Sequence, residues 1–149
     1  MKKETDPRMH SAEHILNQTM VRMFSCNRSF NAHIEKKKSK CDYQFERPLT
    51  EEEIHHIEEQ VNDVIRTDML IAEEHITREV AQKQYNLERL PENLGDKIRI
   101  VRIGDYDACP CIGSHVKSTK EIGTFCIVSS SFETGVLRIR FKLGQSEAP

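Results

Sequence analysis

The chain has 149 residues, a length typical of one domain, and its 22 lysines and arginines nearly balance 24 aspartates and glutamates, giving a formal net charge of −2. This balance excludes a uniformly basic nucleic-acid-binding protein, although it leaves room for a local basic patch. Hydrophobic residues make up 37% of the chain and charged residues 31%, and this composition excludes an intrinsically disordered protein.

The lack of long apolar segments and the number of cysteines indicate the cellular compartment. No apolar stretch approaches the roughly 18–20 residues that span a bilayer. The positive start at Met1–Pro7 is not followed by the apolar segment of a signal peptide. Five cysteines are an odd number in such a chain, so free thiols or metal ligands are favoured over disulfides. We therefore expect a cytoplasmic protein.

The first half of the chain predicts two main helices around a hairpin. Asp6 and Pro7 are typical of a helix start, and apolar residues at helical spacing continue this helix to about residues 25–27. Two short extended stretches follow, at 29–35 and 40–46, with a lysine-rich tip between them. Thr50 and Glu53 form a capping box, which predicts the second helix.

The second half predicts mainly strands. We expect a strand at 69–78, a short helix at 78–85, and strands at 98–103, 106–109, 125–132 and 136–143. The last two flank a turn containing Gly135. These elements predict one domain over residues 1–149, of the α+β class, in which an antiparallel sheet is packed by two main helices.

Two pairs of metal-ligand residues share one spacing. His10 and His14 are four positions apart on the first predicted helix, and Cys111 and His115 repeat this spacing. Side chains at i and i+4 of a helix share a face, and nitrogen and thiolate ligands suit zinc. The alternatives are half-buried histidines on an amphipathic helix and a small buried cysteine. Glu13 precedes His14 instead of following His10, so the His-Glu-x-x-His arrangement of metalloproteases is absent.

The sequence around both pairs resembles a known family. Residues 111–123, CIGSHVKSTKEIG, resemble the signature C-x-x-x-H-V-x-x-T-G-E-I-G of the editing domain shared by alanyl- and threonyl-tRNA synthetases. Residues 10–16, HSAEHIL, resemble its H-[ST]-A-x-H-[IL]-L element. The chain looks like the freestanding, AlaX-type form of this domain. The resemblance implies an α+β fold and a zinc ion surrounded by His10, His14, Cys111 and His115.

The resemblance also implies an activity, the hydrolysis in trans of the ester of a mischarged tRNA. The expected substrate is Ser-tRNA(Ala), with Gly-tRNA(Ala) as a further one. Zinc would either lower the pKa of a bound water or anchor the amino acid, and His115 would complete the metal shell or shuttle a proton. The alternatives are editing of Ser-tRNA(Thr), a non-catalytic tRNA- or zinc-binding module, and a structural zinc site.

Further residues carry weaker expectations. Lys120 replaces the usual glycine of the signature, and Glu121 either orients a metal ligand or is an exposed loop carboxylate, which we favour. His55, His56 and Cys109 are not expected to bind the metal. Substrate contacts are expected of Ser29 and Asn31, and tRNA contacts of Lys36, Lys37, Lys38 and Lys40, together with Arg138, Arg140 and Lys142 on one strand face. The oligomeric state, monomer or dimer, stays open.

Overall fold

The computed structural model describes residues 6–88, 90–91 and 95–144. The first five residues, on which the signal-peptide expectation partly depends, lie outside them. In chain order the elements are α1 (Pro7–Phe24), β1 (Asn31–His33), β2 (Ser39–Gln44), α2 (Glu51–Arg66), β3 (Ile71–Thr77), α3 (Arg78–Gln84), β4 (Lys97–Ile103), β5 (Asp107–Pro110), the 3-10 helix η1 (Thr119–Ile122), β6 (Phe125–Glu133) and β7 (Val136–Leu143).

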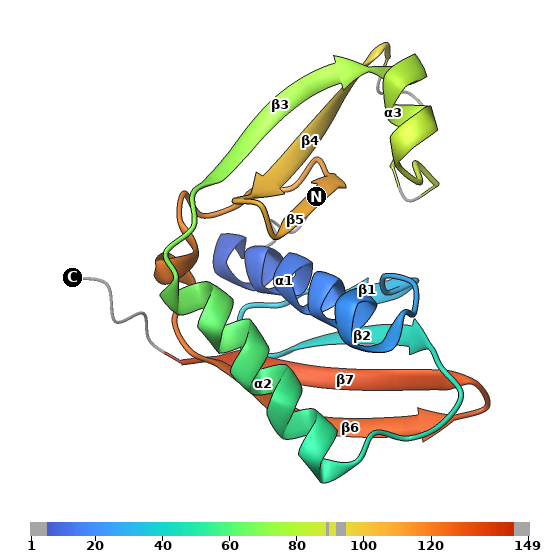
Figure 1. Ribbon diagram of the computed structural model, residues 1–149, viewed down its shortest axis with the longest axis vertical. Coiled ribbons are helices and arrows are strands. Elements are labelled where there is room, and N and C mark those ends of the chain that lie inside the picture. The colour runs from blue at the N-terminus through green and yellow to red at the C-terminus, as the bar shows by residue number, and fades with distance from the viewer. Residues whose placement is uncertain (1–5, 89, 92–94, 145–149) are drawn as a thin grey trace.

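The strands form two antiparallel sheets, in the orders β1-β2-β7-β6 and β3-β4-β5 (Figure 1). The α+β class is therefore confirmed, but the strands divide between two sheets where we expected one. The division follows from β4, which pairs with β3 along one edge and with β5 along the other. The alternation of side chains along a strand indicates its buried face but does not identify its partner.

Helix α1 lies between the two sheets (Figure 1). It begins where the Asp6 carboxylate accepts hydrogen bonds from the backbone N–H groups of Arg8 and Met9, and it ends at Ser25, which has a left-handed φ of 56°. Both predicted ends are confirmed. Its apolar residues Met9, Ala12, Ile15, Leu16 and Met20 are at most 1% exposed, so α1 is anchored in the main core by burial of its apolar face.

Helix α2 covers the same face of the four-stranded sheet, beside α1 (Figure 1). The predicted capping box is present, because Thr50 and Glu53 each bind the backbone N–H of the other. The side chain of Asn62 donates to the Phe125 carbonyl at 2.9 Å and accepts from its N–H at 2.8 Å, which ties α2 to β6. His55 and His56 are exposed on α2, as predicted.

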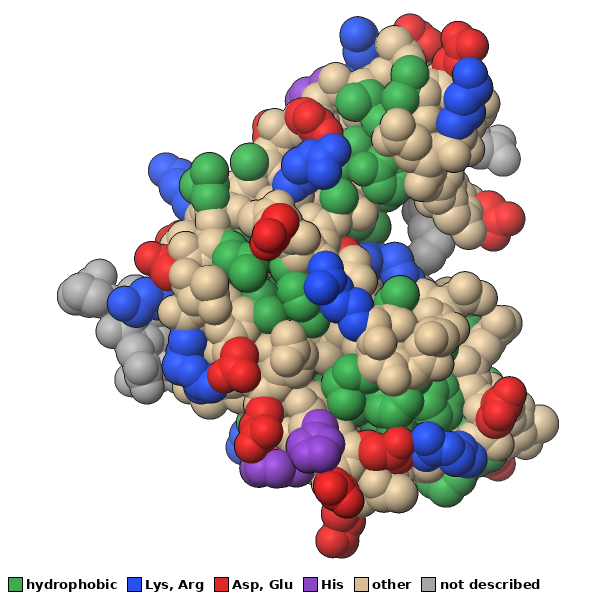
Figure 2. Space-filling view, viewed as in Figure 1, with side chains coloured by type: hydrophobic (Ala, Val, Ile, Leu, Met, Phe, Trp, Pro, Cys, Tyr) green, Lys and Arg blue, Asp and Glu red, His purple; other side chains and the backbone are tan. Residues whose placement is uncertain are grey.

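The three-stranded sheet has a smaller core of its own. Ala81 of α3 packs there against Ile98 and Ile100 of β4. The outline of the molecule is indented on one side between this end and the four-stranded sheet, and acidic and basic side chains are interspersed over the face shown (Figure 2). Among the helices of the described ranges, none has the length and apolar character to cross a membrane.

Candidate metal centre

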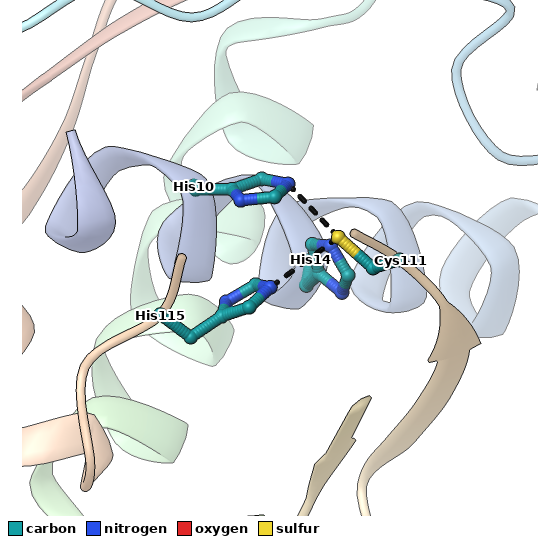
Figure 3. A group of neighbouring side chains, drawn as sticks. All are labelled: His10, His14, Cys111 and His115. Atoms are coloured by element: carbon teal, nitrogen blue, oxygen red, sulfur yellow. Dashed lines mark hydrogen bonds between the residues drawn. The ribbon is translucent and has the colours of Figure 1, made fainter. Parts of the chain in front are cut away.

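Four side chains from two distant segments meet at one point (Figure 3). Helix α1 supplies His10 and His14, and the loop after β5 supplies Cys111 and His115. One ligand atom of each residue lies within 4.8 Å of the ligand atoms of the others. The structure therefore brings together all four residues that the sequence selects, although 101 positions separate His10 from Cys111.

The Cys111 thiol is at the centre of the group. Its Sγ lies 3.3 Å from His10 Nε2 and 3.5 Å from His115 Nε2. The rings of His10 and His115 are stacked with centroids 4.3 Å apart, and the His14 ring stands nearly perpendicular to both. Three imidazoles and one cysteine sulfur thus lie close enough together to hold one metal ion.

The other ring nitrogen of each histidine faces an oxygen atom. His10 Nδ1 lies 3.2 Å from the Ser114 carbonyl oxygen. His115 Nδ1 lies 2.9 Å from Ser11 Oγ. His14 Nδ1 is 3.6 Å from the Asp107 carboxylate. Hydrogen bonds of this kind fix the ring orientation of metal-binding histidines, as at His10 and His115, whereas His14 Nδ1 is buried without a hydrogen-bond partner among the described residues. The three Nε2 atoms are left for an ion. The residues present therefore fit a divalent metal.

Asp107 lies beside the candidate metal centre, and the sequence interpretation did not single it out. It is 4% exposed, and its carboxylate accepts hydrogen bonds from Arg28 at 2.7 Å and Gln18 at 2.9 Å. Burial disfavours its charge, but His14 and Arg28 hold its pKa down at about 2. The ionised carboxylate is thus fixed beside His14. The only signal in the sequence was an acidic residue four positions before Cys111.

The surroundings of three of these residues also shift their pKa values. Burial alone would raise the pKa of Cys111, but hydrogen bonds with the three histidines lower it to about 3, so the sulfur is a thiolate. Burial lowers the pKa of His115 to about 4, so this imidazole is neutral. For His14, Asp107 and Cys111 outweigh the effect of burial and raise the pKa to about 9. A metal ion would have to displace that proton.

The loop that carries Cys111 and His115 is held by Arg99 of β4. The Arg99 guanidinium donates to the carbonyl oxygens of Cys111 at 3.0 Å and Gly113 at 2.8 Å, and it also donates to Glu73 at 2.7 Å. Gly113 lies directly against His10, because a Cβ atom there would be 2.2 Å from Cε1 of the ring. The sequence interpretation assigned no role to Arg99.

The signature residues after this loop form the turn η1. Lys120 is exposed within η1 and is absent from the residues with positive φ, so the change from glycine needs no unusual backbone there. The Glu121 carboxylate accepts from the backbone N–H groups of Lys117 at 3.0 Å and Ser118 at 2.9 Å. It is an exposed loop carboxylate, as we favoured, and it caps this turn.

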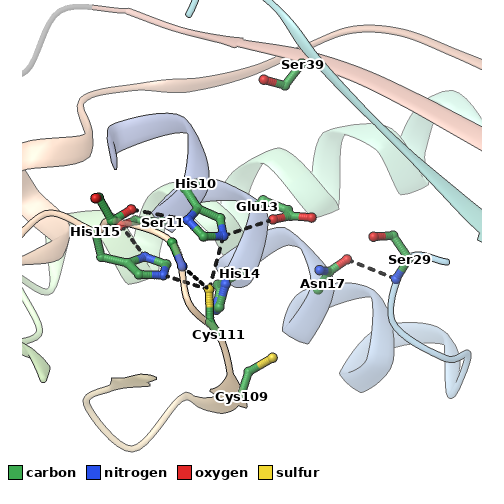
Figure 4. Close-up of polar contacts among 12 residues, drawn as sticks. His10, Ser11, Glu13, His14, Asn17, Ser29, Ser39, Cys109, Cys111 and His115 are labelled. Carbon is green, nitrogen blue, oxygen red and sulfur yellow. Dashed lines mark hydrogen bonds and ion pairs between the residues drawn. The ribbon is translucent and has the colours of Figure 1, made fainter. Parts of the chain in front are cut away.

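The two residues expected to contact the substrate lie elsewhere in the described structure. Ser29 is buried, and its backbone N–H donates to Asn17 at 3.2 Å, apart from the four ligands (Figure 4). Asn31 is exposed and donates to Asp42 at 3.3 Å. No described contact joins either residue to the metal group, so their substrate role stays a prediction.

The remaining candidate residues for metal or tRNA binding differ in their surroundings. Cys109 is outside the metal group, and burial raises its pKa to about 11. Arg138 binds the Asp42 carboxylate through two nitrogens, at 2.7 and 2.9 Å, so its charge is already balanced. Lys36, Lys37 and Lys38 are exposed between β1 and β2. A shallow pocket beside them is lined by His33, Glu35, Lys38, Ser39, Lys40 and Arg140.

Comparison with known proteins places this site in a family context. Residues 98–140, which include Cys111 and His115, match the threonyl and alanyl tRNA synthetase second additional domain. The alanine–tRNA ligase of Coxiella burnetii (strain Dugway 5J108-111) is 33% identical over 141 residues, which are 93% of this chain and 16% of the ligase. This chain resembles the editing domain of alanyl- and threonyl-tRNA synthetases.

Two other alanine–tRNA ligases are similar to this chain over nearly its whole length. The ligase of Fervidobacterium nodosum is 33% identical over 141 residues, again 93% of this chain and 16% of the ligase. That of Aeropyrum pernix is 31% identical over 146 residues, 95% of this chain and 16% of the ligase. The chain thus spans about one sixth of the length of these relatives. The resemblance stated from the two motifs is confirmed.

Proposed function

We propose that the chain is a metal-dependent aminoacyl-tRNA deacylase that hydrolyses the ester of a mischarged tRNA supplied in trans. The convergence of His10, His14, Cys111 and His115 carries this proposal, because it occurs in a relative of alanine–tRNA ligases. Zinc is the ion that this nitrogen and thiolate donor set favours. We place the whole activity in one domain over residues 1–149.

The substrate follows from the limits of amino-acid selection. A pocket for alanine cannot strongly reject serine, which adds one hydroxyl, or glycine, which is smaller. A second, hydrolytic site solves this problem, so we propose Ser-tRNA(Ala), and next Gly-tRNA(Ala), as substrates. Ser-tRNA(Thr) is the alternative, since the matching family covers both synthetases.

We propose a different role in this reaction for each group of residues. The Cys111 thiolate and the neutral His115 imidazole, with His10 and His14, would hold the ion. Ser11 holds the His115 ring through a hydrogen bond, and the Asp107 carboxylate lies beside the His14 ring. When bound, zinc would supply Lewis-acid chemistry for hydrolysis of the ester. The lysines of the β1–β2 hairpin are proposed to bind phosphates of the tRNA. They are Lys36, Lys37, Lys38 and Lys40.

The proposal is tested by deacylation of radiolabelled Ser-tRNA(Ala), with Ala-tRNA(Ala) and Ser-tRNA(Thr) as parallel substrates. The reaction is measured before chelation, after chelation and after zinc repletion. We expect zinc-dependent loss of serine from tRNA(Ala) with alanine spared. His10→Ala removes one ligand and is expected to lower deacylation by at least about 100-fold, on the order of the effect of a misplaced reacting group.

The matched control for that substitution is His56→Ala, which removes an exposed histidine of α2 and should leave the rate unchanged. Serine loss from tRNA(Thr) alone would support the alternative substrate. Hydrolysis of none of the three substrates by zinc-loaded protein would reject the enzymatic proposal in favour of a binding module. Unchanged deacylation by His10→Ala would reject this site.

A further inference from the structure

A row of basic side chains crosses three neighbouring strands of the four-stranded sheet. The pairing of the strands places His33 of β1 opposite Lys40 of β2, and Lys40 opposite Arg140 of β7. Residues directly opposite one another share a face of the sheet. Ile139 and Phe141, which flank Arg140 along β7, are buried in the main core, and successive side chains of a strand alternate between faces. The row therefore lies on the face of the sheet that is turned away from the main core.

The row borders a shallow pocket of about 180 Å³. The residues that line it are His33, Glu35, Lys38, Ser39, Lys40 and Arg140. Lys38, Lys40 and Arg140 are positively charged at neutral pH, whereas the lining includes one carboxylate, that of Glu35, which lies 3.4 Å from His33. The lining residues therefore give the pocket an excess of positive charge.

The neighbouring row on the same face has its charges balanced. There Asp42 of β2 lies opposite Arg138 of β7, and the guanidinium donates to both carboxylate oxygens, at 2.7 and 2.9 Å. Arg138 holds the pKa of Asp42 below its usual range, and the charge of Lys40 adds to this effect. Lys40 thus shares a carboxylate that Arg138 already binds, while it faces the like charge of Arg140. Like charges directly opposite are destabilising, and an anion bound between them would remove this repulsion.

Phosphate is the anion that suits these side chains. A guanidinium binds two phosphate oxygens through parallel hydrogen bonds, and a lysine binds phosphate as a point charge. We infer that Lys38, Lys40 and Arg140 form a binding pocket for one backbone phosphate of the tRNA. A shallow pocket admits a phosphate whose chain continues on both sides, and the exposed Lys36 and Lys37 next to it are placed to contact neighbouring phosphates.

This inference rests on the proposed function and deepens it, because it indicates which part of the tRNA the pocket contacts. His10 and His14 belong to α1, which packs on the opposite face of the four-stranded sheet, the face that holds Ile139 and Phe141. The sheet thus lies between the pocket and the candidate metal centre. The terminal nucleotide that carries the ester does not reach through this layer, so the bound phosphate belongs to a nucleotide closer to the acceptor stem.

The test measures binding of deacylated tRNA(Ala) by fluorescence anisotropy over a range of salt concentrations. For Arg140→Gln we expect the Kd to rise on the order of tenfold at low salt, as for loss of a charge-assisted hydrogen-bonded pair. The slope of log K against log salt should fall by about 1, the effect of one lost phosphate contact. Arg140→Lys keeps the charge but not the paired hydrogen bonds, so it should restore the slope and only part of the affinity.

The matched control is Arg66→Gln, which removes an exposed arginine of α2 that is paired with Asp63. It changes the net charge as Arg140→Gln does and should keep the affinity and salt slope of the wild type. Equal loss of affinity in both variants would show that overall charge attracts the tRNA, and would overturn the inference. Equal Kd and slope for Arg140→Gln and wild type would also overturn it, while leaving the proposed function intact.

Two further measurements define the ligand. Inorganic phosphate titrated alone should bind more weakly than tRNA, and Arg140→Gln should weaken both. Loss of phosphate binding without a change in tRNA affinity would instead assign the pocket to free phosphate and overturn the inference. Hydrolysis of a seryl ester of adenosine should be equal in Arg140→Gln and wild type, because this substrate lacks the backbone phosphate, and a reduced rate would contradict the placement. Arg140-dependent tRNA binding without hydrolysis of any aminoacyl-tRNA would support the inference and count against the proposed function alone.

Discussion

Gly113 is packed directly against His10 of the candidate metal centre. A Cβ atom at this position would lie 2.2 Å from Cε1 and 2.4 Å from Nδ1 of His10, distances that force the ring to move. Metal ligands must keep their positions within a few tenths of an ångström. The size of one side chain at Gly113 therefore determines whether His10 can act as a ligand.

Gly113→Ala should weaken zinc binding by on the order of tenfold or more, similar to loss of a contact that orients a ligand. The measurement is competition with a chromophoric chelator. Gly144→Ala is the matched control, because a Cβ there would meet Thr124 at 3.6 Å, an ordinary contact. Equal zinc affinity of Gly113→Ala and wild type would show that His10 is not held by this packing.

The grouping of the four candidate ligands could be predicted from the sequence, but the residues that support them could not. His10, His14, Cys111 and His115 have chemistry and spacing that point to a metal. Asp107 reaches His14 only because β5 lies beside α1, and Arg99 reaches the Cys111 carbonyl only through the folded loop. Such contacts depend on tertiary placement, which one sequence does not contain.

At the scale of elements, the sequence predicted those features that depend on residues close together in the chain. The capping box at Thr50 predicted the start of α2, and the turn at Gly135 predicted the hairpin of β6 and β7, which runs from Phe125 to Leu143. The separation of β3, β4 and β5 into a second sheet was not predicted, since it depends on pairing between residues far apart in sequence.

The β1–β2 hairpin is the element proposed to bind tRNA phosphates. Changing Lys38 and Lys40 together to glutamine should raise KM for aminoacyl-tRNA several-fold, leave kcat unchanged, and make binding less dependent on salt, since each lost phosphate contact lowers the salt slope by about 1. Hydrolysis of a seryl ester of adenosine, which lacks the tRNA backbone, should not change.

The control for the hairpin variant neutralises Arg66 and Lys83, whose charges are paired with Asp63 and Glu79 within their own helices. This double glutamine variant has the same net charge as the hairpin variant and separates a local effect from a global one. An equal rise in KM for both variants would show that overall charge, and not this hairpin, attracts the tRNA.

At the scale of the whole molecule, the metal centre joins the two sheets. His10 and His14 belong to α1, which is anchored in the main core, whereas Cys111 and His115 follow β5 of the three-stranded sheet. An ion bound to all four would therefore act as a cross-link between these parts. The main core does not depend on this cross-link, because its residues are buried by packing of α1 and α2 on the four-stranded sheet, together with Ile103 and Tyr106 from the side of the three-stranded sheet.

This independence predicts the result of removing zinc. The chelated chain should keep its helical circular dichroism but unfold at a lower temperature, because zinc at 1,000 times its Kd stabilises the native state by about 4 kcal/mol. Amide exchange should accelerate most in the loop from Cys111 to Val116, whose position depends on its ligands. A structural zinc site predicts instead that chelation unfolds the chain. Global loss of the circular dichroism signal on chelation would thus favour a structural ion over a catalytic one.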